Sequence, residues 1–476
     1  MYEWKDIPPN KIQKAVFKLQ KRIYQASLRG DVKAVRKLQR LLMNSWSTKC
    51  LAVSRVTQDN LKMGNSVSHL GIRGNGEKFS QLPLPNSPFP ILKISDKAAP
   101  KQKNSARTVT IYDRALQVLV ELALSPEWSA KFSPFCYGFR PGRPCHEAIA
   151  AIYNGIVQLP QYVLIVEIAQ ASYRQNHNAV LKKLAANPSL RRLIKAWLKA
   201  GVMDGNQLFP STEMTPQAGI ISPLLAKIAM QVLETEITTA LSRGVGKTKV
   251  QRHPTTIGYA GNFLVMDEDI SVILKAKEIA EKWLSGMGLE LQPGTTRVAH
   301  TLNEYEGNVG FDFLGCNFRQ YKVGKCHSKV GYKTFVKPSK EAIKRHLEQV
   351  DDVLKKHKAS STQSSLISAL NSVIRVWKSY YSNLVSNNEA FEYLDSVLYQ
   401  KLLAWAKYRH PNKNNTEIVS KYWLVNQGDG WKFATKEPNN RYVLVKYRHT
   451  QIVRDVKVKN KRNPYGVLEK GYKSHD

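Results

Sequence analysis

Residues 107–325 alternate between stretches with helical periodicity and apolar runs that are too short to form helices. Residues 113–128 repeat apolar side chains at helical spacing, whereas YVLIVEIA at 162–169 is almost continuously apolar and predicts a buried strand. Further elements are expected as helices at 178–187, 189–201 and 270–288 and as a strand at 311–321. This mixture predicts an α+β domain built around a small, mostly antiparallel sheet.

One segment of this region predicts a β-hairpin. In TTIGYAGNFLVMDED (255–269) an apolar run at 257–260 breaks at Gly261-Asn262 and resumes at Phe263. A Gly-Asn pair between two apolar runs is typical of a tight hairpin turn. We therefore expect the turn at Gly261-Asn262.

Composition and periodicity change along the chain and divide it into five segments. Residues 1–60 predict a basic helical extension, and 61–106 predict a loop-rich segment because Gly, Pro and Ser are frequent there without periodicity. The α+β region then covers 107–330. Residues 331–410 contain three long amphipathic helices, and 411–476 form a basic tail with short strand-like pieces.

The charge of the chain indicates a polyanionic partner. Its 476 residues include 72 Lys+Arg against 37 Asp+Glu, a net charge of +35. Residues 1–60 alone hold 13 Lys+Arg against 4 Asp+Glu, and residues 401–476 hold 17 against 6. Binding to phosphates is favoured by such an excess because it releases condensed counterions. No apolar run approaches the roughly 18 residues that a membrane span needs, so we expect no membrane partner.

Cysteine usage and the N-terminus indicate a cytoplasmic protein. The five cysteines are scattered and never form a CxxC pair, which predicts a reducing compartment and no zinc ribbon. The first residues carry acids and no apolar core, so we expect no secretory signal.

Long segments in a fixed order carry a family resemblance. They are VFKLQKRIYQASLRGDVKAVRKLQRLL (16–42), SPFCYGFRPGRPCHEAI (133–149), TPQAGIISPLLAKIA (215–229), FDFLGCNFRQY (311–321) and VIRVWKSYYSNL (373–384). In this order they resemble the N-terminal extension, fingers, nucleotide-pocket segment, primer-side palm and maturase (X) domain of reverse transcriptases encoded by bacterial group II introns. The resemblance implies an α+β fold with right-hand reverse transcriptase-like fingers and palm, followed by an all-helical thumb and maturase (X) domain.

The same resemblance shows which polymerase residues have changed. The family's reaction uses two Mg²⁺ ions about 4 Å apart, held mainly by carboxylates, one Asp from a strand and two from a hairpin. The family's strand motif Asp-Ile-x-x-x-Phe-Asp here begins with Glu167 and ends with Tyr173, and its Tyr-Ala-Asp-Asp hairpin ends with Gly261 and Asn262. These four are vestigial polymerase positions with one carboxylate among them, so we expect no catalytic residue and no metal site.

Nearby acids and other motifs support the same interpretation. Asp267, Glu268 and Asp269 follow the second strand of the hairpin, too far along it to reach the turn, and are expected in a solvated turn. Ala218 stands where the family has Gly, and Thr295 where it usually has Lys. No cysteine follows position 326, so we expect none of the paired CxxC zinc sites of the endonuclease domain that continues many relatives.

Several Lys and Arg residues are candidates for contacts with RNA. On one predicted helix Lys11, Lys14, Lys18 and Arg22 share a face opposite an apolar stripe. In the X domain we expect the aromatics to pack in the core, namely Trp377, Tyr381 and Trp405, and the cations beside them to contact RNA. The candidate RNA-binding residues are Lys11, Lys14, Lys18, Lys21, Arg22, Arg36, Arg140, Arg143, Arg375, Lys378, Lys407 and Arg409.

The expected function is that of a splicing maturase, which stabilises the active fold of a group II intron RNA without polymerase activity of its own. We expect the protein to bind no cofactor and no small-molecule substrate, while the intron RNA requires Mg²⁺. Two alternatives stay open: a weak or altered polymerase that uses Glu167, and a scaffold that recruits nucleic acid or protein. A metal-dependent primer-extension assay distinguishes the maturase from the altered polymerase. The identity of co-purifying RNA distinguishes the maturase from the recruitment scaffold.

Overall fold

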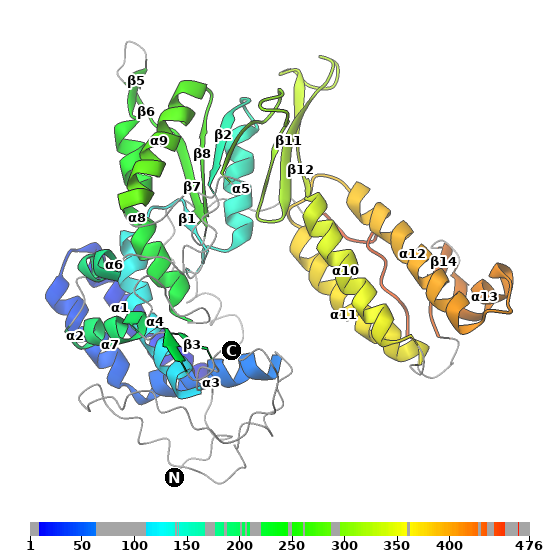
Figure 1. Ribbon diagram of the computed structural model, residues 1–476, viewed down its shortest axis with the longest axis horizontal. Helices are drawn as coiled ribbons and strands as arrows, with labels where there is room; N and C mark the ends of the chain where they lie inside the picture. The colour runs from blue at the N-terminus through cyan, green and yellow to red at the C-terminus, as the bar shows by residue number, and fades with distance from the viewer. Residues whose placement is uncertain are drawn as a thin grey trace, which may run out of the picture. The chain divides into compact units, whose positions relative to one another are not determined.

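The computed structural model describes residues 9–62, 111–138, 140, 142–166, 177–184, 188–199, 202–204, 207–209, 220–245, 250–259, 262–286, 296–358, 362–426, 430–435, 442–452 and 465 (Figure 1). They belong to two compact units. The first comprises Met1–Pro144, Leu164–Arg297 and Lys459–Asp476, and the second Cys145–Val163 and Val298–Val458. Within these ranges no helix has both the length and the hydropathy to cross a membrane. Most of the expected loop-rich segment, 63–106, lies outside the described residues.

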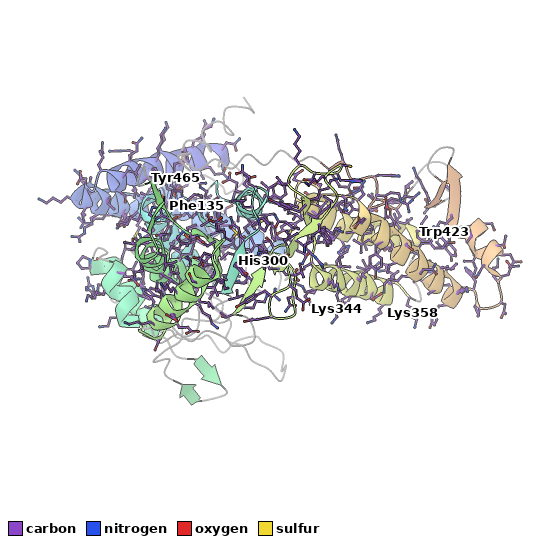
Figure 2. The ribbon with its side chains drawn as sticks, turned by 90° about the horizontal axis from the view of Figure 1, so that it is seen from above. Phe135, His300, Lys344, Lys358, Trp423 and Tyr465 are labelled. Carbon is purple, nitrogen blue, oxygen red and sulfur yellow. The ribbon has the colours of Figure 1, made fainter. Side chains whose placement is uncertain are left out.

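The first unit begins with four helices: α1 (Pro9–Leu28), α2 (Val32–Asn44), α3 (Trp46–Lys62) and α4 (Ile111–Lys131). The first three confirm the expected helical extension. The apolar face of α1 packs against α4. Side chains fix this contact, because Gln20 donates to the carbonyl of Leu122 at 2.9 Å and Ser27 donates to that of Glu127 at 3.0 Å. Far along the chain, Tyr465 packs its ring against α1 as well (Figure 2).

A five-stranded sheet, in the order β1-β7-β8-β2-β9, carries the predicted hairpin. β7 (Thr255–Tyr259) pairs antiparallel with β8 (Asn262–Asp267) and parallel with β1 (Cys136–Tyr137). β2 (Tyr162–Val166) is apolar and buried as expected, and β9 (Arg297–His300) completes the order. Two helices pack against the hairpin, α8 (Ser222–Ala240) on β7 and α9 (Ile270–Gly286) on β8. The hairpin and the mixed α+β character are thus confirmed. The expected position of the turn, at Gly261-Asn262, is wrong, because Asn262 already belongs to β8 and pairs with Tyr259.

Shorter elements complete the first unit. They are α6 (His177–Leu184), α7 (Pro188–Lys199), and two small antiparallel pairs, β3 (Val202–Asp204) with β4 (Gln207–Phe209) and β5 (Arg243–Val245) with β6 (Val250–Arg252). The two helices confirm those expected from residues 178–187 and 189–201.

The second unit contains α5 (Cys145–Ile156) packed on a three-stranded antiparallel sheet. The sheet consists of β10 (Phe311–Phe313), β11 (Cys316–Lys322) and β12 (Tyr332–Pro338). The single strand expected at 311–321 is wrong, since the chain reverses at Leu314-Gly315. Both residues have positive φ, 51° and 73°, as a two-residue type I′ hairpin turn requires.

The rest of the second unit is mainly helical. α10 (Lys340–Lys356), α11 (Gln363–Tyr381) and α12 (Glu389–Arg409) confirm the three predicted helices. Strands β13 (Trp423–Asn426) and β14 (Gly430–Phe433) match the expected strand-like pieces. Residues 415–422 differ from that expectation, because Asn414 and Glu417 form a capping box that begins the helix α13 (Asn415–Tyr422).

Candidate nucleic-acid interface

The hairpin β7–β8 ends in the register pair Tyr259 and Asn262. The side chain of Asn262 is partly exposed, and a neutral amide therefore stands at this end of the hairpin. The other positions that the sequence analysis compared with the family's aspartates, Glu167, Tyr173 and Gly261, lie outside the described residues.

The acids at the end of β8 and just after it accept hydrogen bonds from nearby backbone N–H groups. Asp267 accepts a hydrogen bond from the backbone N–H of Asp269 at 2.9 Å, and Asp269 accepts one from the N–H of Ser271 at 2.9 Å. Both carboxylates therefore shape the turn that starts α9. The expectation of a turn is confirmed, but Asp267 is buried and not solvated. Among the residues with described positions, no group of three His, Cys, Asp or Glu side chains could hold a metal ion.

A small recess behind the hairpin is lined by charged groups as well as by Tyr259 and Asn262. Lys227 of α8 extends into it and donates to the backbone carbonyls of Tyr137, at 2.8 Å, and Gly138. Glu234, also on α8, lies over Gly258 so closely that a Cβ at this glycine would collide with the carboxylate. One helix, α8, thus contributes both a lysine and a glutamate to the lining of the recess.

Burial controls the ionisation of this cluster. Burial raises the pKa of Glu234 to about 7, although the cations Lys227 and Arg140 oppose the shift. Burial also raises the pKa of Cys136 to about 11, and it lowers that of Lys227. This cluster was not among the sites expected from the sequence. The available signal was the spacing of Lys227 and Glu234, which lie seven residues apart and therefore share one face of the helix.

The candidate cations near the N-terminus occupy the surface of α1 and α2. Lys11, Lys18 and Arg22 are exposed, Lys14 and Lys21 are partly exposed, and Arg36 of α2 is exposed. The opposite side of α1 is buried at Val16 and Ile23. We refer to these six cations as the α1–α2 basic surface.

Arg140 and Arg143 are not at the surface, which corrects the expectation that they contact RNA. They are only 9% and 4% exposed. Arg140 donates to the backbone carbonyls of Ser129, Ser133 and Cys136 at 2.6–2.8 Å. Its guanidinium thus satisfies backbone acceptors within the fold, as buried polar groups must.

The aromatics of the helical domain form its core, as expected. Trp377, Tyr381 and Trp405 are buried. Trp377 stacks on His346 with ring centroids 5.0 Å apart, and Nε1 of Trp405 donates to the carbonyl of His357 at 2.9 Å. These rings are therefore occupied by packing within the domain.

The four candidate cations of the helical domain differ in accessibility. Arg375 and Lys407 are exposed. Lys378 is half-buried and donates to the carbonyl of Lys446 at 2.6 Å, while Arg409 lies over the ring of Trp405 at 4.9 Å. Arg375 and Lys407 are thus the more accessible pair for a phosphate.

Three family models match in sequence order and correspond to the parts described above. The N-terminal domain of reverse transcriptase matches residues 4–68, reverse transcriptase (RNA-dependent DNA polymerase) matches 99–318, and the group II intron maturase-specific domain matches 343–423.

Individual relatives agree with these models. Maturase-like protein 1 of Euglena gracilis is 24% identical over 433 residues, covering 87% of this chain and 84% of that protein. Protein YkfC of Escherichia coli (strain K12) is 25% identical over 263 residues, covering 49% of this chain and 66% of that protein. The group II intron-encoded protein LtrA of Lactococcus lactis subsp. cremoris is 28% identical over 131 residues, 26% of this chain and 21% of that protein. With its reverse transcriptase and maturase domains in this order, the chain belongs to the group II intron reverse transcriptase and maturase family.

Proposed function

We propose that this protein is an RNA-binding splicing maturase that stabilises the active fold of a group II intron RNA and does not polymerise nucleotides. The observation that carries the proposal is Asn262, which stands beside Tyr259 at the end of the hairpin. A hard divalent cation prefers anionic oxygens, and an amide offers one neutral oxygen.

The surroundings of Asn262 support the loss of polymerisation. Asp267 and Asp269 are engaged in the turn before α9 and lie at the far end of β8. Lys227 extends into the recess that Asn262 lines, and a lysine there makes the approach of a divalent cation electrostatically less favourable.

The maturase-specific domain and the cationic surfaces support the RNA-binding part of the proposal. The intron RNA performs the chemistry with its own Mg²⁺. By binding the folded RNA more tightly than misfolded forms, the protein shifts the population toward the active form.

Primer extension tests the absence of polymerisation. The full chain, an annealed primer–template and nucleoside triphosphates are incubated with Mg²⁺ or Mn²⁺, and we expect no template-directed product. The double variant Gly261→Asp with Asn262→Asp should remain inactive, because Ala218 and Thr295 also depart from the family pattern. Robust extension by the parent would favour the altered polymerase. Family-like activity in the double variant would show that the other departures from the family pattern do not prevent polymerisation.

Identification of co-purifying RNA separates the maturase from a recruitment scaffold. We expect group II intron RNA to be enriched with the full chain. Enrichment of unrelated nucleic acid, or of none, would contradict the proposal.

A further inference from the structure

The strands β11 and β12 form a hairpin (Figure 1). The side chains on its two faces differ in burial and in chemical character. One face is core: Phe318, Gln320 and Val336 are almost fully buried, and the amide of Gln320 donates to the carbonyl of Ile156 at the end of α5 at 2.6 Å. Because side chains alternate across a strand, the residues between these point to the other side of the sheet. The hairpin is thus held rigidly by its core face.

The other face, here called the outer face, consists of Arg319 and Tyr321 on β11 and Lys333, Phe335 and Lys337 on β12. Lys333 is exposed, and the other four are partly exposed. The register pairs Arg319 with Phe335 and Tyr321 with Lys333, so cations and rings alternate both along and across the strands.

Ring and cation contacts organise the outer face. The rings of Tyr321 and Phe335 meet edge to face, with centroids 5.5 Å apart and planes at 84°. The guanidinium of Arg319 lies 4.8 Å from the ring centroid of Tyr321, and Nζ of Lys337 lies 5.5 Å from both rings. These contacts hold two aromatic rings and two cations together at a partly exposed surface.

The charge of this hairpin is one-sided. Residues 316–338 contain six Lys or Arg and no Asp or Glu. The acids near the outer face are Asp312, which accepts from Asn317 at 2.6 Å, and Glu389, which pairs with Lys337 at 2.6 Å. Of the described carboxylates, none forms an ion pair with Arg319 or Lys333, so these two cations remain for phosphates.

We propose that the outer face binds a single-stranded segment of RNA, with bases stacked on Tyr321 and Phe335 and phosphates contacted by Arg319 and Lys333. Unpaired bases stack on aromatic side chains without strong sequence preference, whereas a positively charged strip follows the backbone. The rigid core face supports such a site, because it fixes both rings before the ligand arrives. This proposal deepens the proposed function by naming the form of RNA that one surface takes, and it rests on RNA being the partner.

A salt series separates stacking from charge. The full chain is titrated into a labelled adenosine oligoribonucleotide of about ten residues at several salt concentrations, and the dissociation constant is read from fluorescence anisotropy. Tyr321→Leu and Phe335→Leu should each weaken binding by about tenfold at every salt concentration, because stacking depends little on salt. Lys333→Ala should instead lower the log–log salt slope by about 0.7, the value for one phosphate contact to a single strand.

Two further variants serve as controls. Tyr321→Phe keeps the ring and should bind like the parent. Tyr393→Leu removes an exposed ring from α12, beside Glu392 and Asp395, and should also leave binding unchanged. Parent-like binding by Tyr321→Leu and Phe335→Leu, with unchanged thermal unfolding, would overturn the proposal. So would tighter binding of the matching deoxyribonucleotide.

Photo-crosslinking tests the site without a substitution. An oligoribonucleotide that carries 5-iodouridine should crosslink to Tyr321 or Phe335 of the parent chain, and crosslinks confined to other segments would contradict the outer face. A chain that crosslinks there but does not promote intron splicing would retain the site and refute the maturase function. A chain that promotes splicing without this crosslink would support the maturase function and refute the outer face as an RNA-binding site.

Discussion

In the recess behind the hairpin, the absence of a side chain at Gly258 leaves room for the carboxylate of Glu234. The glutamate lies where any side chain at position 258 would have to be. A carboxylate enclosed in this way is stabilised in its protonated form, which is why burial raises the pKa of Glu234 to about 7. The two residues lead to separate predictions, one about packing and one about ionisation.

Gly258→Ala should destabilise the protein by about 1–3 kcal/mol, since either the α8 side chain or β7 must move to accept the methyl group. Chemical denaturation of the full chain measures the change. Gly286→Ala is the matched control, because a Cβ at this position of α9 meets no other atom within 4 Å. Equal stability of the two variants would show that Glu234 can leave its position without cost.

Glu234→Gln should change how stability depends on pH. With a pKa of about 7 in the folded protein against an ordinary 4.5, Glu234 holds a proton between these values that the unfolded chain has lost. The parent's free energy of unfolding should therefore fall, relative to that of Glu234→Gln, as the pH rises from 4.5 to 7. The whole difference should amount to at most about 3 kcal/mol. Denaturation at a series of pH values tests this, and parallel curves would contradict the buried carboxylic acid.

At the scale of elements, periodicity predicted most helices and the central hairpin, because the apolar face of each element must match its burial. Two kinds of feature could not be predicted. The turn between β10 and β11 is Leu314-Gly315, and leucine is not a residue that usually marks a positive φ. Arg140 carries the same charge as a surface arginine, and only the fold places three carbonyl acceptors around it.

The helix α1 should be a principal RNA contact. Changing Lys11, Lys14, Lys18 and Arg22 together to Ala should leave the fold intact, because the buried face of α1 is untouched. Intron binding should weaken, and its log–log salt slope should fall by about 3, the sum of four phosphate contacts. The matched control exchanges Lys for Arg and Arg for Lys at these positions and should bind like the parent. An unchanged slope in the alanine variant would mean that this side of α1 is only solvated surface.

At the scale of the whole molecule, the family and the order of its parts were predictable from long motifs, because such motifs combine many residues. The metal-binding positions of a polymerase centre, in contrast, are only a few residues. Asn262 has a neutral side chain in the structure, and Glu167, Tyr173 and Gly261 lie outside the described residues. The protein thus combines a fold of the reverse transcriptase family with exposed cations on α1 and α2.

Splicing of a cognate group II intron at low Mg²⁺ tests the central claim, since the RNA folds poorly there without assistance. The fraction of spliced RNA is followed in time with the parent chain, with the α1 alanine variant, and without protein. We predict that the parent accelerates splicing, that the variant does so much less, and that neither extends a primer in the same buffer. If the parent binds the intron tightly but leaves the splicing rate equal to that of the RNA alone, the maturase function is contradicted.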